Sequence, residues 1–481
     1  MLFNSYQFVI FFGLVFVLNF LLPHKFRWVI LLASSYYFYM SWDPKMIVLI
    51  IFTTLLHYFA GMYIHKNKDK PKIRKFILVT AILASLAILL FFKYFNFFTT
   101  SVSEAFALFS IKFDPVILKL ALPMGISFYT FQTLSYTIDV YREKIQPESH
   151  PGYMALYVSY FPQLIAGPIG RAGNLLPQFK AEKKMTVKDF DVGIKRVAIG
   201  LFKKIVVADT FAKAVNVVYN DVHQFNGFIL LVATLMFAVQ IYCDFSGYSD
   251  MALGVAKMMG IDLMENFRSP YLSKSIKEFW GRWHISLSTW FKDYVYIPLG
   301  GNRKGKIRTN FNLFATFLLS GLWHGANLTF IIWGALHGFY QVIERALKIG
   351  AKIDKSKAKI ALLGIVPTFA LVCFAWIFFR ANTLDDAFYV IKNMFDGIKQ
   401  PRTYLAAIKP YLNITSTGIK ILFGELLMLL VIDIGNRNGR LIEHLNQRKA
   451  WLRWGICVLF VFVVFYLSTK SGNAEFIYAQ F

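Results

Sequence analysis

The chain alternates between long apolar runs and short polar segments that carry many of its basic residues. An α-helix needs about 20 apolar residues to cross the hydrocarbon core of a membrane. The pattern therefore predicts an all-α integral membrane protein of about 11–13 helices, interrupted segments included. The clearest candidate spans are residues 5–22, 27–43, 46–64, 76–98, 115–138, 228–247, 360–379, 417–434 and 455–468.

Two further apolar segments do not fit a simple crossing. Residues 153–170 contain Pro162 and Gly167 and lie between basic segments, and residues 279–300 lie between basic segments in the same way. Both ends of each segment therefore fall on the same predicted side. Irregular backbone is tolerated at membrane depth where protein or water surrounds it, and membrane sites are often built there. We expect re-entrant or broken segments around a central funnel.

A different pattern covers residues 190–215, where basic residues such as Lys203 and Lys204 interleave with apolar ones at helical spacing. One interpretation is an amphipathic helix along the inner interface. The other is an ordinary cytoplasmic helix end whose lysines extend toward water.

The composition excludes a soluble or disordered chain. Of 481 residues, 57% are hydrophobic and 16% are charged, against about 45–50% and about 25% in soluble domains. The net charge of +25 does not indicate nucleic-acid binding, because the basic residues cluster in short loops, as the positive-inside rule describes. That rule predicts that residues 66–75, 303–308 and 437–453 are cytoplasmic and that both termini are outside.

An ionisable side chain within an apolar run is a candidate functional residue. His324 is such a residue, and a buried neutral imidazole can act as a general base. Gly321 and Gly325 flank it and allow a substrate or another backbone to approach. The alternative is a core histidine satisfied by a neighbouring helix.

The segment 279–293 is a second candidate, because it combines Arg282, His284 and Lys292 with several tryptophans. It predicts either a water-filled funnel or an interfacial helix with an aromatic belt. At the end of another span, Asp244 and Asp250 are either acid/base groups or partners of nearby basic residues, and we favour the second role.

The sequence lacks the motifs of several common enzyme classes. It has no P-loop, no HExxH, no CxxC pair and no G-x-S-x-G turn. It therefore predicts no metal site of those types.

Seven motifs occur in an order that resembles the membrane-bound O-acyltransferase family, in particular the bacterial branch that O-acetylates alginate or peptidoglycan. The motifs are LPMGISFYTFQ (122–132), YFPQLIAGP (160–168), DFSGYSD (244–250), FRSPY (267–271), FWGRWH (279–284), GLWHGA (321–326) and WIFFR (376–380). The resemblance implies one polytopic domain over residues 1–481, with a core at residues 122–380.

The resemblance also implies an activity and its residues. Acetyl-CoA would be the cytoplasmic acyl donor, and His324 would be the catalytic base beside the second histidine, His284. His284 and Asn327 are the candidates to stabilise the oxyanion that forms during acyl transfer, and Trp323 is a candidate to contact the substrate. For the CoA phosphates the candidates are Arg282, Lys292 and Arg303, whose alternative role is positive-inside topology.

The same resemblance places the protein in the bacterial cytoplasmic (inner) membrane, in contact with lipid. It implies a periplasmic acetyltransferase as partner and no nucleic acid. Two alternatives are a secondary transporter, which should show an internal repeat that this sequence lacks, and a non-catalytic scaffold of a glycan-modification complex.

Overall fold

A computed structural model describes residues 1–118, 122–182, 185–349, 358–397 and 416–468 of the chain. The described residues form helices joined by turns and loops, with no β-strand among them. Two compact units are present: residues 1–193 with 252–264, and residues 194–251 with 265–481. The helical content of the described residues confirms the predicted all-α class. The single domain over residues 1–481 and the central funnel stay predictions.

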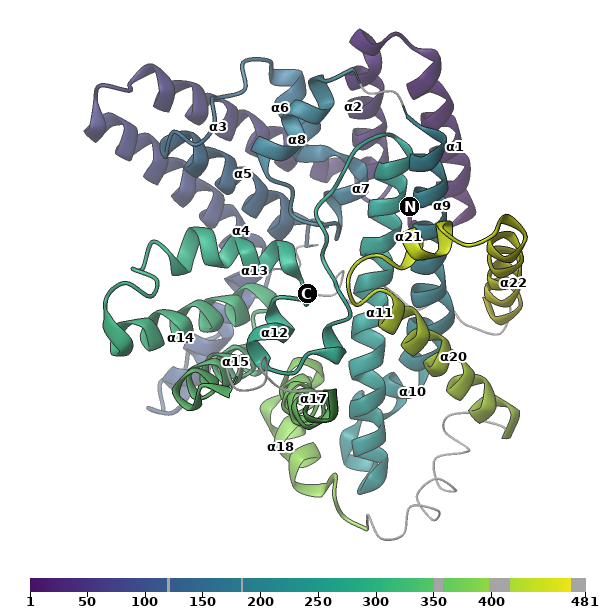
Figure 1. Cartoon of the computed structure of the whole chain (residues 1–481). Helices are drawn as coiled ribbons and strands as arrows, with labels where there is room; N and C mark the ends of the chain where they lie inside the picture. The colour runs from purple at the N-terminus through teal and green to yellow at the C-terminus, as the bar shows by residue number, and fades with distance from the viewer. Residues whose placement is uncertain (119–121, 183–184, 350–357, 398–415, 469–481) are drawn as a thin grey trace. The chain divides into compact units, whose positions relative to one another are not determined.

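The first unit begins with apolar helices that follow the predicted spans (Figure 1). Its α3, α4 and α5 pack against one another. The bounds are α1 Tyr6–Leu21, α2 His24–Met40, η1 Pro44–Met46, α3 Ile47–Lys66, α4 Pro71–Ala107, α5 Ile126–Tyr141, α6 Pro151–Ser159, α7 Phe161–Leu164 and α8 Ala172–Lys180.

A buried histidine joins three of these helices. Nδ1 of His57 in α3 lies 2.7 Å from Thr137 Oγ1 in α5, and Nε2 lies 2.8 Å from Ser85 Oγ in α4. Both ring nitrogens therefore have partners, which a buried polar group requires. His57 is a satisfied core histidine.

The predicted span 115–138 begins late. Its helix, α5, starts at Ile126, directly after Gly125 with φ of +72°. This left-handed conformation suits glycine, and the nearby Pro123 cannot donate a backbone hydrogen bond. The apolar composition of residues 115–118 and 122–125 therefore did not make them helical, and residues 119–121 of this predicted span lie outside the described residues.

The predicted break in residues 153–170 is confirmed. α6 ends at Ser159, α7 is a single turn, and the chain is irregular up to Arg171. Side chains satisfy one carbonyl group that the break releases: Gln132 and Gln163 both donate to Tyr157 O, at 2.5 and 2.9 Å. This agrees with the rule that irregular backbone at membrane depth needs internal partners.

The second unit contains the remaining helices, and α9 and α11 pass between the two residue sets. The bounds are α9 Val187–Leu201, η2 Phe202–Ala208, α10 Asp209–Tyr219, η3 Val222–Gln224, α11 Phe228–Met258, η4 Pro270–Leu272, α12 Ile276–Trp280, α13 Ile285–Phe291, η5 Lys292–Tyr296, α14 Gly305–His324, α15 Leu328–Leu347, α17 Ala358–Arg380, α18 Leu384–Asn393, α20 Ser416–Gly435, α21 Leu441–Asn446 and α22 Ala450–Ser468.

Both interpretations of residues 190–215 are wrong for Lys203 and Lys204. These lysines lie in η2, a π-helical turn, and are 3% and 5% exposed. They face carboxylates rather than water: Lys203 pairs with Asp250, and Lys204 pairs with Asp209 and Asp244. Asp244 and Asp250 lie far from the two lysines in the sequence, and Asp209 does not lie at an α-helical repeat from Lys204. Helical spacing alone therefore could not reveal these partners.

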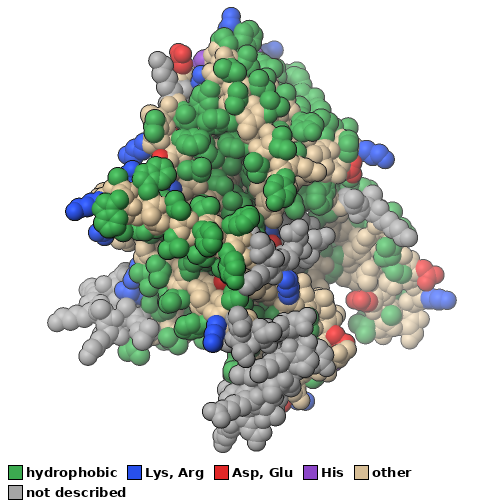
Figure 2. Space-filling model, turned by 90° about the vertical axis from the view of Figure 1, so that its right-hand side faces the viewer, with side chains coloured by type: hydrophobic (Ala, Val, Ile, Leu, Met, Phe, Trp, Pro, Cys, Tyr) green, Lys and Arg blue, Asp and Glu red, His purple; other side chains and the backbone are tan. Residues whose placement is uncertain are grey.

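Several described helices are suited to a membrane. Five stretches are long and apolar enough to cross: 44–66, 71–107, 228–258, 363–380 and 450–467. α20 also forms as expected, although Lys420, Glu425 and Asp433 interrupt its apolar sequence. Large hydrophobic side chains are exposed on many helices, and Figure 2 shows them over much of one face. Such a surface is typical of contact with lipid.

Candidate active site

His284 lies in the break between two short helices of the interrupted segment 279–300. α12 ends before Gly281, and α13 begins directly after His284. The backbone of His284 is left-handed, with φ of +44°, and the side chain is fully buried. Non-glycine residues seldom adopt this conformation, and such strain is concentrated at functional sites. The backbone thus indicates a site here independently of the motif.

The His284 ring contacts the side chain of Asn266 and several aromatic rings. Its Nδ1 lies 3.2 Å from Oδ1 of Asn266. The ring of Phe245 meets it edge-on, with centroids 4.7 Å apart, and the indole of Trp323 lies 6.3 Å away. These neighbours keep bulk water from the imidazole and hold it in one orientation.

His324 ends α14, which packs along α15 (Figure 1). The two backbones meet closely at Gly321 and Gly334: a Cβ added to Gly321 would lie 3.1 Å from Gly334 Cα. A Cβ on Gly325 would overlap the ring of Phe330. The close approach expected at Gly321 and Gly325 is therefore made by α15.

Aromatic rings also surround His324, which is 3% exposed. Trp323, Trp333 and Phe379 meet it edge-on, with centroids 4.8, 4.9 and 5.4 Å away. Trp323 thus neighbours both histidines. The structure brings His284, His324 and Trp323 into one aromatic cluster although the two histidines are far apart in sequence.

Asn327 has a structural task at the start of α15. Its Oδ1 accepts from Thr329 N at 3.0 Å, which caps the helix, and its Nδ2 donates to Asn382 O at 2.9 Å. One amide hydrogen is left over from these two bonds. The oxyanion role of Asn327 stays a prediction that depends on this hydrogen.

The three basic candidates differ in exposure. Arg282 pairs with Glu278 at 2.9 Å and donates to the backbone oxygen of Arg268 at 3.2 Å. Lys292 and Arg303 are exposed. Binding of CoA phosphates therefore stays a prediction for all three residues, with Lys292 and Arg303 the more accessible.

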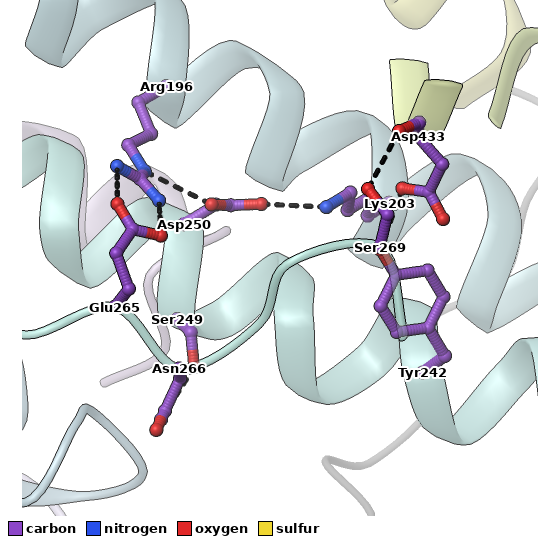
Figure 3. A network of polar contacts seen from close by, with 9 residues as sticks. All are labelled: Arg196, Lys203, Tyr242, Ser249, Asp250, Glu265, Asn266, Ser269 and Asp433. Atoms are coloured by element: carbon purple, nitrogen blue, oxygen red, sulfur yellow. Dashed lines mark hydrogen bonds and ion pairs between the residues drawn. The ribbon is translucent and has the colours of Figure 1, made fainter. Parts of the chain in front are cut away.

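A network of buried and partly buried charges joins α9, η2 and α11 to the residues just before the 267–271 motif (Figure 3). Arg196 donates to both carboxylate oxygens of Glu265 at 2.7 Å and to Asp250 at 3.1 Å. Asp250 also accepts from Lys203 at 2.8 Å. Burial disfavours the Arg196 charge, but the two carboxylates outweigh it and hold the pKa of Arg196 above its usual range.

These contacts confirm that Asp244 and Asp250 are partners of basic residues. Glu265, Asn266 and Asp433 were not predicted from the sequence, although the first two directly precede the 267–271 motif. Asp433 accepts from Tyr242 OH at 2.7 Å. An acidic residue inside the apolar run of α20 was a signal that could have revealed it.

The described residues contain no group of three or more His, Cys, Asp or Glu side chains placed to bind a metal ion. The aromatic cluster contains the imidazoles of His284 and His324, and the ring of His337 also lies against Trp333, with centroids 5.0 Å apart. Such a cluster can accept and return a proton in a site protected from water.

Comparison with known proteins identifies the family. The model of MBOAT, the membrane-bound O-acyltransferase family, matches residues 31–381. The chain belongs to the membrane-bound O-acyltransferase family. Both histidines and all seven motifs lie within the matched residues.

Individual relatives support the same assignment. The chain is 42% identical over 396 residues to "Probable alginate O-acetylase AlgI" of Pseudomonas aeruginosa, covering 82% of this chain and 75% of that protein. It is 32% identical over 487 residues to "Peptidoglycan O-acetyltransferase" of Helicobacter pylori, covering 94% and 91%. It is 31% identical over 277 residues to "Teichoic acid D-alanyltransferase" of Bacillus subtilis, covering 54% and 69%.

The family and the helical structure together confirm the resemblance drawn from the motifs. This MBOAT chain is a membrane protein and an O-acyltransferase. The relatives share acyl transfer but differ in the named acceptor, which leaves the donor, the acceptor and the catalytic residues of this chain to be argued from its site.

Proposed function

We propose that this chain moves an acetyl group from cytoplasmic acetyl-CoA to an acceptor at the outer face of a bacterial inner membrane, for O-acetylation of an extracytoplasmic polysaccharide. Two relatives named for O-acetylation of alginate and of peptidoglycan support the acetyl group and the class of polymer. The observation that carries the proposal is the cluster of His284 and His324 around Trp323, buried among aromatic rings.

The chemistry requires one base and one protected thioester. A nitrogen of neutral His324 takes the proton of an acceptor hydroxyl while the oxygen attacks the thioester carbonyl carbon. The carbonyl oxygen becomes an oxyanion, the C–S bond then breaks, and the imidazolium returns its proton to the CoA thiolate. Acetylated acceptor and CoA are the products, and His324 is neutral again.

Two features of the site suit this step. Aromatic rings exclude water, which would otherwise hydrolyse the thioester. A hydrogen-bond donor near the carbonyl would stabilise the oxyanion. Asn327 can supply its remaining amide hydrogen, whereas His284 can supply one from Nε2 if that nitrogen carries the proton.

The direction of transfer follows from the proposed topology. We place residues 66–75, 303–308 and 437–453 in the cytoplasm and both termini outside, because of the distribution of basic residues. The final residues, 469–481, lie outside the described part of the chain. Lys292 and Arg303 would then meet CoA phosphates at the cytoplasmic mouth, and a periplasmic acetyltransferase would receive the acetyl group.

The test is acetyl transfer by the purified chain in lipid nanodiscs, followed as CoA thiol release from acetyl-CoA with the periplasmic acetyltransferase and a soluble glycan fragment present as acceptors. His57→Gln is the matched control, because His57 is an equally buried histidine whose two nitrogens bind hydroxyl groups. We expect wild-type and His57→Gln proteins to release CoA and His324→Gln to be nearly inactive. Absence of CoA release by a folded wild-type protein would favour the transporter or the scaffold.

A further inference from the structure

The side chain of Asn266 is fully buried, and its hydrogen bonds fix which end of the amide is oxygen. Oδ1 accepts from the backbone N–H of Ser286 at 3.3 Å and from the Ser286 hydroxyl at 2.6 Å. A backbone N–H can only donate, so the atom that faces it is the oxygen. Nδ2 correspondingly donates to Ser249 Oγ at 3.2 Å, as Figure 3 shows.

The same oxygen determines the tautomer of His284. Nδ1 of His284 lies 3.2 Å from Asn266 Oδ1, which has no hydrogen to give, so Nδ1 is the donor. In a neutral imidazole with its proton on Nδ1, Nε2 carries the lone pair. The ring then offers a proton acceptor, not a donor, at Nε2.

We infer that Asn266 is a positioning residue, which holds His284 in the Nδ1–H tautomer and makes Nε2 a hydrogen-bond acceptor for a substrate O–H or N–H. This inference rests on the proposed function, because it assigns His284 a role in that reaction. It also removes neutral His284 from the oxyanion donors, since its single N–H is occupied by Asn266. Asn327 is the remaining candidate donor.

The backbone around Asn266 is fixed to the segment that carries His284. Ile285 N donates to Asn266 O at 2.9 Å, and Arg268 N donates to Arg282 O at 2.9 Å. These two bonds lie on either side of His284 and hold its left-handed backbone. Glu265, the neighbour of Asn266, is in turn held by the two-pronged contact from Arg196.

A purely structural Asn266 would satisfy buried groups and do no more. The positioning role and the purely structural role differ in whether the tautomer of His284 and the turnover depend on the hydrogen-bond acceptor at Asn266 Oδ1. Asn266→Asp keeps an acceptor for His284 Nδ1 and for Ser286 with little change of size, whereas Asn266→Ala removes it. Asn312 provides a matched control: it is also fully buried and donates to a backbone carbonyl, that of Gly301, at 3.0 Å.

The first experiment reads the tautomer without any activity. Protein labelled with ¹⁵N-histidine is measured by NMR, and the His284 signals are assigned by their loss in His284→Ala. We expect the protonated nitrogen to be Nδ1 in the wild type and the Nδ1–H form to be depleted in Asn266→Ala. A wild-type ring protonated at Nε2 alone would overturn the inference.

The second experiment measures acetyl transfer by Asn266→Ala, Asn266→Asp, Asn312→Ala, His284→Ala and the double variant Asn266→Ala/His284→Ala. For a metal-bound histidine, loss of the residue that orients the ring typically costs about 10- to 100-fold, and we expect a loss of the same order here. We expect Asn266→Ala to lose this much in kcat with KM for acetyl-CoA unchanged, Asn266→Asp to recover most of it, and Asn312→Ala to lose thermal stability but not kcat.

The double variant separates action through His284 from general damage. If Asn266 acts through His284, removing it from the His284→Ala protein costs nothing further. Additive losses, or wild-type kcat in a folded Asn266→Ala, would overturn the inference. Failure of the proposed function would look different: wild-type protein would release no CoA, while the NMR result would still report the tautomer.

Discussion

The ring of His324 meets the indole of Trp333 edge-on, with centroids 4.9 Å apart and the planes at 82°. Trp333 is fully buried and also stacks on Trp376, with centroids 5.9 Å apart. A single indole thus connects the proposed base to the core of the second unit. Stability and protection of the site from water should both depend on it.

Trp333→Ala should therefore lower stability and admit water. Truncating a buried tryptophan typically costs about 3–5 kcal/mol, whereas Trp333→Phe leaves a smaller gap. We expect a marked fall in the thermal midpoint of Trp333→Ala and more CoA released per acceptor acetylated, because water competes for the thioester. The exposed Trp451→Ala is the control, and equal midpoints for the two alanine variants would contradict the packing argument.

His324→Gln tests the base directly. Glutamine keeps hydrogen-bonding capacity and approximate size but cannot take the proton. A positioned general base contributes about 10²–10⁴-fold in rate, so turnover should fall at least about 100-fold while the protein stays folded and binds acetyl-CoA. Turnover, thermal midpoint and acetyl-CoA affinity are measured together. Turnover above about a tenth of wild type would exclude His324 as the base.

The sequence predicted the helices well where composition alone decides. The runs that became α1, α3 and α17 are predominantly apolar, and a run of this length has few alternatives to a helix. It failed for residues 122–125, where the local backbone preferences of Pro123 and Gly125 outweigh hydrophobicity. The breaks at 153–170 and 279–300 were foreseen because proline, glycine and basic residues contradicted a simple crossing.

The site was predictable in part. His284 and His324 were identifiable because a histidine in an apolar run is costly, and the motifs linked them. Asn266 was not, because its importance lies in one oxygen that contacts Ser286 and His284 from a distant segment. Lys203 was misread for the same reason: its carboxylate partner, Asp250, lies on another helix.

Lys203→Met should be costly because it leaves a buried carboxylate short of a partner. Lys203 is 3% exposed and pairs with Asp250 at 2.8 Å. Removing one member of a buried ion pair typically costs about 3–5 kcal/mol. We expect a large fall in the thermal midpoint, partly recovered when Asp250→Asn is added. Lys213→Met, at an exposed lysine, is the control. Equal thermal midpoints for Lys203→Met and Lys213→Met would show that the Lys203–Asp250 pair does not contribute to stability.

Lys292→Glu and Arg303→Glu test the CoA-phosphate assignment. Both side chains are exposed, so a change of charge should leave the fold intact and act on an anionic ligand. We expect KM for acetyl-CoA to rise with kcat unchanged, and the rise to shrink at high salt because salt screens exposed charges. Lys66→Glu, in another predicted cytoplasmic loop, is the control. An equal change in KM in all three variants would assign these residues to topology alone.

The orientation of the chain can be tested at the two ends of one helix. α4 has 37 residues and is therefore about 56 Å long, more than enough to cross a bilayer once. Lys70 precedes it and Lys112 follows it, and both are exposed. Because the basic segment 66–75 is predicted to be cytoplasmic, Lys70→Cys should react with a membrane-impermeant maleimide only in inverted vesicles, and Lys112→Cys only in intact spheroplasts.

Cys243 and Cys373 are buried, so Cys457→Ser is the background that keeps native labelling low. Labelling of Lys70→Cys from the periplasmic side would reverse the predicted orientation and, with it, the side from which acetyl-CoA must enter.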